Sequence, residues 1–172
     1  MVGWADLPAD LSDTAALARL SAHLPAKAPV ISSDLSRAVA TADRLAPRHR
    51  LPHDPALREL HFGQWDLRPF AEVEAETPDL IYRFWDDPGD TRAPGGESWN
   101  DLCARTWAAL DRLEGLARDV IVVAHFGPIV AALQRAGGAS AREAFAHRID
   151  PLSVTSLTLL PRGRIHAINH AP

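Results

Sequence analysis

Residues 119–133, DVIVVAHFGPIVAAL, decide the expected fold. The apolar run Val120–Ala124 predicts a buried strand, because it is short and rich in β-branched residues. His125 stands at the tip of that strand, and Pro128–Arg135 then has helical spacing until two glycines end it. The stretch therefore predicts a strand, a turn that carries an imidazole, and a helix.

Outward from this stretch, helical patterns alternate with short apolar strands. Further helices are expected over 13–24, 35–46 and 97–117, with one or two more inside 70–86. A further strand is expected at 30–32, and a terminal hairpin is expected from 153–160 and 164–169. Ser98 and Asp101 have the spacing of a capping box. We expect a single α/β domain over residues 1–172, with three α/β/α layers and a mostly parallel sheet.

The composition narrows the class of protein. The chain has 172 residues, 47% of them hydrophobic, and its net charge of −4 comes without a basic stripe, which argues against a nucleic-acid partner. Cys103 is the only cysteine, so an internal disulfide or a cysteine zinc cluster is excluded. The sequence has no apolar stretch of membrane-spanning length and no secretory pattern at residue 1. We expect a cytoplasmic protein without a membrane partner, and the oligomeric state is not readable.

Two predicted strand ends carry chemically suggestive residues. The segment Ser32–Asp34 follows the first strand and leads to Arg37 in the next helix, while His125 follows the later strand. Ligands of open α/β sheets bind beyond the carboxyl ends of the strands, and helix N-termini favour anions. These residues predict a phosphate site. The alternatives are a structural role for His125, a surface ion pair for Arg37, and helix capping by Ser33.

Other phosphate and hydrolase chemistries lack their motifs. There is no P-loop, no G-x-S-x-G elbow and no H-E-x-x-H pair. A cysteine phosphatase would need an arginine six residues after its nucleophile, but Ala109 holds that position relative to Cys103. These absences do not exclude a metal site, because the chain has eight histidines, but no tight His/Asp cluster indicates one.

Four stretches, in order along the chain, resemble the motifs of the histidine phosphatase superfamily with its phosphoglycerate mutase-like fold. They are SSDLSRAVATADRLA (32–46), LRELHFGQWD (57–66), PGGESWNDLCAR (94–105) and VVAHFGPIVAAL (122–133). The similarity is greatest to short phosphatase members such as α-ribazole phosphatases. It implies a hydrolase that acts on a small phosphorylated molecule through a phosphohistidine, with no metal and no cofactor at the site.

The resemblance also implies roles for individual residues. Arg37 and His125 would bind the phosphoryl group, and Glu59 would protonate the leaving alkoxide. Glu97 and Ser98 would face the ligand or only cap a helix. The alternative for Glu59 is an ion pair with the neighbouring arginine or another arginine of its loop.

The chain departs from the family at its beginning. The family's first strand ends in Arg-His-Gly, whose histidine is the nucleophile, whereas this sequence opens with a segment resembling the part downstream, with Gly3 and Asp6 at matching positions. We therefore expect an N-terminally truncated domain that lacks its first central strand and is inactive as given. A smaller departure is Phe126, where the family usually has glycine; its side chain would narrow the pocket or turn into the core.

Three interpretations remain open. In the first, which is favoured because Glu59 and His125 are retained, the start codon is misassigned or the chain is a fragment of a phosphatase. In the second, the chain is a pseudoenzyme that binds a phosphorylated ligand. In the third, it transfers phosphoryl groups as a mutase, which the short 66–97 region makes less favourable. The aromatic residues of that region are expected either to form a lid or simply to pack: they are Phe70, Tyr82, Phe84 and Trp85.

Overall fold

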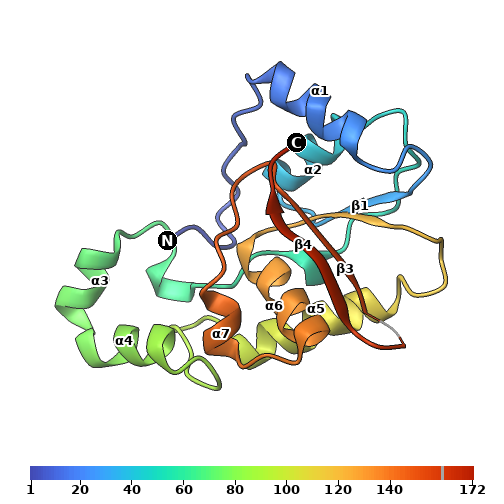
Figure 1. Ribbon diagram of the computed structural model, residues 1–172. Helices are drawn as coiled ribbons and strands as arrows, with labels where there is room; N and C mark the ends of the chain where they lie inside the picture. The colour runs from blue at the N-terminus through green and yellow to red at the C-terminus, as the bar shows by residue number, and fades with distance from the viewer. Residues whose placement is uncertain (160) are drawn as a thin grey trace.

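The computed structural model describes residues 1–159 and 161–172 (Figure 1). In chain order the elements are α1 (Thr14–His23), β1 (Val30–Ser32), α2 (Ser36–Asp43), the 3₁₀ turns η1 (Pro55–Leu57) and η2 (Gly63–Trp65), α3 (Phe70–Glu76), α4 (Pro78–Asp86), α5 (Trp99–Asp111), β2 (Ile121–Val123), α6 (Phe126–Gly137), α7 (Ala141–Phe145), β3 (Val154–Thr158) and β4 (Arg164–His170). The expected helices and strands are present, although the helix expected over 97–117 ends at Asp111. α7, η1 and η2 are additions that the sequence did not predict. Leu160, the last residue of the expected strand 153–160, lies outside the described residues.

The strands form two separate pairs. β1 and β2 run parallel, with Val30 opposite Ile121 and Ser32 opposite Val123, while β3 and β4 form an antiparallel hairpin. Figure 1 shows α1 and α2 on one side of the strands and α5 and α6 on the other. The fold is therefore a layered α/β fold with a parallel pair at its centre, as expected. Among the described residues, β2 pairs with β1 alone.

Local signals set the helix boundaries. The capping box of α5 is confirmed, because Ser98 Oγ accepts from Asp101 N and the Asp101 carboxylate accepts from Ser98 N. α6 begins two residues earlier than expected, with His125 as its N-cap residue, and it ends at Gly138, whose φ of +63° suits glycine. None of the described helices is long and apolar enough to cross a membrane.

α3 and α4 form a lobe, residues 70–86, that projects away from the strands in Figure 1. Phe84 is buried in the largest apolar cluster, and Trp85 packs edge-on against it. Phe70 and Tyr82 contact each other on the surface, where they are 41% and 48% exposed. Two of the four aromatic residues therefore serve packing, and the other two remain at the surface.

Candidate active site

The tips of β1 and β2 bring two predicted residues together. Because the strands are parallel neighbours, the residues that follow them lie at the same edge, and Ser33 Oγ lies 2.7 Å from His125 Nε2. The expected capping role of Ser33 is wrong. Leu35 is the N-cap residue of α2, and Asp6 Oδ1 instead accepts from the helix's Ser36 N at 2.7 Å.

The environment keeps the imidazole of His125 neutral. Burial is the largest influence on His125 and, together with the positive charges of Arg37 and Arg105, lowers its pKa to about 3. A neutral imidazole carries one N–H and one free nitrogen, so each ring nitrogen can be assigned a single role. At neutral pH His125 can therefore share a hydrogen bond with Ser33 and offer a second one to a ligand.

Glu59 is bound by backbone amides and not by an arginine. Its Oε1 accepts from Leu60 N at 2.8 Å and from Gly127 N at 2.9 Å. A side chain at position 127 would place its Cβ 2.4 Å from that oxygen, so only glycine allows this approach. The alternative ion pair with Arg58 is wrong, because Arg58 binds Asp34 through two hydrogen bonds of 2.7 and 2.6 Å.

Burial is also the dominant influence on Glu59, and it raises the pKa of this carboxyl. The two amide hydrogen bonds and the charges of Arg37 and Arg105 lower the pKa of Glu59, but their combined effect is smaller. The carboxyl therefore retains its proton to higher pH than an exposed glutamic acid, which is the property that a general acid needs.

Arg105 and Glu97 clamp the loop that carries Glu59. The Arg105 guanidinium binds both carboxylate oxygens of Glu97, at 2.7 and 2.9 Å, and donates to the carbonyls of Ala56, Arg58 and Glu59. Glu97 Oε2 also accepts from His61 N. Glu97 and Ser98, predicted to face the ligand or to cap, are thus both used within the fold: Glu97 in this clamp and Ser98 in the capping box.

Arg37 lies in the first turn of α2 and turns toward the N-terminal segment. It donates from Nη2 to Gly3 O at 2.6 Å and from Nη1 to Ala5 O at 2.9 Å, so its partners are carbonyls and not the carboxylate of a surface ion pair. Its positive charge lowers the pKa of His125 and partly offsets the rise that burial causes in the pKa of Glu59. Arg37 therefore lies within electrostatic reach of both residues, and Glu59 accepts from the amide of Gly127, two residues after His125.

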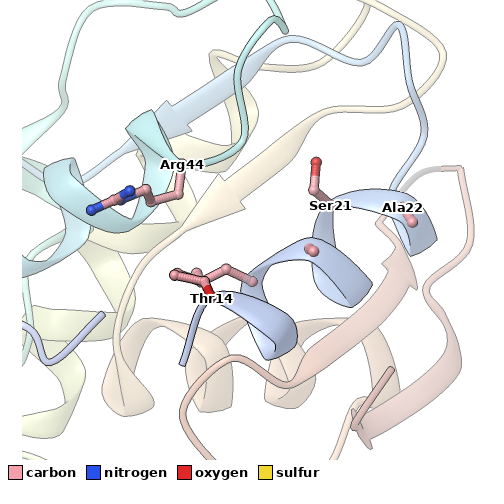
Figure 2. Close-up of a pocket in the computed structure, with 6 residues that line it drawn as sticks. Thr14, Ser21, Ala22 and Arg44 are labelled. Carbon is pink, nitrogen blue, oxygen red and sulfur yellow. The ribbon is translucent and has the colours of Figure 1, made fainter. Parts of the chain in front are cut away.

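Two further features complete the surroundings. Phe126 packs against the largest apolar cluster, its ring 6.1 Å from that of Phe145, so this departure turns into the core. A separate hollow of about 530 Å³ lies between α1 and Arg44, which follows α2, and it is lined mostly by small side chains and by none of the predicted site residues. Figure 2 shows the residues that line it. Within the described residues, no group of three or more His, Cys, Asp or Glu side chains is placed to hold a metal ion.

The sequence did not reveal the partners of the predicted site residues. Glu97 and Arg105 both belong to the family-like motif of residues 94–105. That motif does not indicate that the arginine binds three carbonyls of a distant loop. Similarly, no pattern indicated that Gly3 and Ala5 would bind Arg37.

Known proteins match this arrangement. The model of the Histidine phosphatase superfamily (branch 1) matches residues 8–170. Glucosyl-3-phosphoglycerate phosphatase of Mycobacterium tuberculosis (strain ATCC 25618 / H37Rv) is 36% identical over 123 residues, which cover 62% of this chain and 52% of that protein. The chain thus spans about half the length of this curated relative.

Solved structures extend the likeness to nearly the whole chain. A phosphoglycerate mutase from Thermus thermophilus has a TM-score of 0.73 and 28% identity, covering 98% of this chain and 88% of that one. Bacillus stearothermophilus YhfR has a TM-score of 0.84 at 23% identity, covering 98% and 87%, and this likeness shows the fold alone.

Proposed function

The chain belongs to the histidine phosphatase superfamily, and we propose that it carries the phosphate-binding and proton-donating part of a phosphomonoesterase site. The substrate would be a small phosphorylated molecule. The observation that carries this proposal is the combination of a neutral His125, a Glu59 with a raised pKa and the charge of Arg37 acting on both. Together they supply a cation, an N–H donor and an acid at the end of two parallel strands.

In the proposed reaction, an attacking imidazole forms a nitrogen–phosphorus bond while the bond from phosphorus to the alkoxide oxygen breaks. Glu59 gives its proton to that leaving oxygen, and Arg37 and His125 stabilise the negative charge on the remaining phosphoryl oxygens. Water then attacks phosphorus, gives a proton to the Glu59 carboxylate, and releases phosphate from the imidazole. The steps return the site to its starting state.

We place the attacking imidazole on a strand that pairs with β2 on the side away from β1, because the resemblance implies a further strand in the centre of the sheet. The support is the separation of the two strand pairs. Val123 of β2 and Val154 of β3 pack against the same apolar cluster, yet in the described part of the chain these strands share no ladder. A strand between them would pair with the backbone of β2 and bring its tip toward Ser33 and His125.

Peptide complementation tests this proposal. The chain is mixed with a synthetic peptide that has an apolar strand followed by Arg-His-Gly, and with a control peptide in which glutamine replaces the histidine. We expect hydrolysis of p-nitrophenyl phosphate with the first peptide only, and loss of it in Arg37→Ala. Glu59→Gln should slow hydrolysis of glycerol phosphate more than that of p-nitrophenyl phosphate, because nitrophenolate leaves without needing a proton.

A second candidate is binding of a phosphorylated ligand without turnover. The observation in its favour is that Arg37 and a neutral His125 can bind a phosphoryl group whether or not an attacking imidazole is present. Binding of phosphate by the chain, together with no hydrolysis with either peptide, would support this candidate against the esterase. Transfer between phosphoglycerates after priming with a bisphosphoglycerate would instead indicate a mutase, the activity for which the similar Thermus thermophilus protein is named.

A further inference from the structure

Asp66 holds the chain segment that in turn holds Arg37. It follows η2 directly, and its Oδ1 accepts from Gly3 N at 2.8 Å while its Oδ2 accepts from Ala5 N at 2.9 Å. The carbonyls of the same two residues, Gly3 and Ala5, accept the hydrogen bonds of the Arg37 guanidinium. The segment 3–5 thus lies between one carboxylate and one guanidinium.

This segment has no regular structure that would fix its backbone. Residues 1–6 belong to no helix or strand, so their amides depend on other partners. Gly3 also packs closely, since a Cβ there would lie 2.4 Å from Leu60 O. Any shift of residues 3–5 changes the position of the two carbonyls that orient Arg37.

We propose that Asp66 is a positioning residue for the phosphate-binding arginine, acting through Gly3 and Ala5. The inference rests on the proposed function of Arg37. It requires a carboxylate specifically, because both oxygens accept from amides. An asparagine has one oxygen acceptor, and its NH₂ group would face a backbone N–H that it cannot bind.

The rest of the segment keeps its anchors when Asp66 changes. Met1 binds Arg68 and Leu67 through the main chain, and Trp4 Nε1 donates to Glu59 O at 2.8 Å. Asp66→Asn therefore removes one acceptor without releasing the segment. The matched control is Asp13→Asn: Asp13 accepts from Ala16 N at the start of α1, away from Arg37, and asparagine caps helices equally well.

The test combines two measurements on the full chain. The first is calorimetric titration with inorganic phosphate, for which we expect Asp66→Asn to weaken affinity roughly tenfold and Asp13→Asn to leave it unchanged, as supporting residues commonly affect a site by this factor. The second is ¹⁵N NMR of the Arg37 guanidinium without ligand, where Asp66→Asn should broaden or shift its signals and accelerate exchange with water.

The outcomes separate this inference from the proposed function. If the unaltered chain does not bind phosphate, the proposed function fails, whereas the NMR comparison still decides whether Asp66 positions Arg37. If phosphate binds but Asp66→Asn changes neither its affinity nor the Arg37 signals, the positioning role is refuted. Equal losses in Asp66→Asn and Asp13→Asn would likewise refute it, because they would indicate general destabilisation.

Discussion

The two strand pairs of this molecule differ sharply in their surroundings. β1 is buried at all three residues, and Val30 and Ser32 have no exposed surface. The residues of β4, in contrast, are all exposed or half-buried, and the hairpin packs against α6. Both pairs contribute to one apolar cluster, through Val30 and Val154. They therefore share a core but not the same degree of enclosure.

This difference explains where the candidate chemistry lies. Buried groups feel a low dielectric, which shifts the pKa of His125 downward and that of Glu59 upward. A histidine of the hairpin, His166, has an exposed side chain that is hydrogen-bonded to Thr158. Matched substitutions in the two regions test this difference in burial.

The largest expected effect is a loss of folding stability at acidic pH. Between about pH 6.5 and pH 3 the unfolded chain binds a proton that the buried His125 does not, so stability falls as the pH falls through this window. The loss amounts to roughly 4 kcal/mol by pH 3, because the pKa of His125 is about 3 in the folded chain and about 6.5 in the unfolded chain. His125→Asn should remove this loss in urea unfolding measured against pH.

His166→Asn, in the hairpin, is the matched control and should keep the steep acid dependence of the unaltered chain. If His125→Asn and the unaltered chain lose stability in parallel as the pH falls, burial does not lower the pKa of His125 at the strand tip.

The second comparison removes one arginine from each region. Arg105→Ala leaves the Glu97 carboxylate, 18% exposed, without its cation and frees three carbonyls, so we expect a loss of about 3 kcal/mol. Arg148→Ala breaks the Arg148–Asp150 pair beside the hairpin, in which Arg148 is 81% exposed, and should cost less than about 0.5 kcal/mol. Chemical denaturation at neutral pH measures both, and similar losses would contradict the contrast.

The smallest difference concerns packing alone. Val30→Ala removes two methyl groups from a site with no exposure, and we expect it to cost about 2 kcal/mol. Val154→Ala, in the half-buried β3, should cost about 1 kcal/mol, because water already reaches part of the side chain. The urea midpoints of the two variants measure both losses of stability. A larger loss in Val154→Ala than in Val30→Ala would contradict the expected order.

Much of the fold followed from local patterns in the sequence. The Ser98–Asp101 spacing predicted the start of α5, and the glycines after Arg135 predicted the end of α6. α7 was missed because it is short, although Ser140 and Glu143 form the capping box that could have revealed it. The capping role expected of Ser33 failed because Asp6, distant in the sequence, supplies the acceptor at the start of α2.

Local sequence patterns are enough to predict the alternation of helices and strands and the residue types at the two strand tips. Periodicity and capping act over a few neighbouring residues, so they can be read without a structure. Only the tertiary structure decided that Ser33 meets His125, that Gly127 leaves room for Glu59, and that the first residues of the chain bind Arg37. These contacts join residues far apart along the chain, and burial, which sets their pKa values, exists only once the layers have packed.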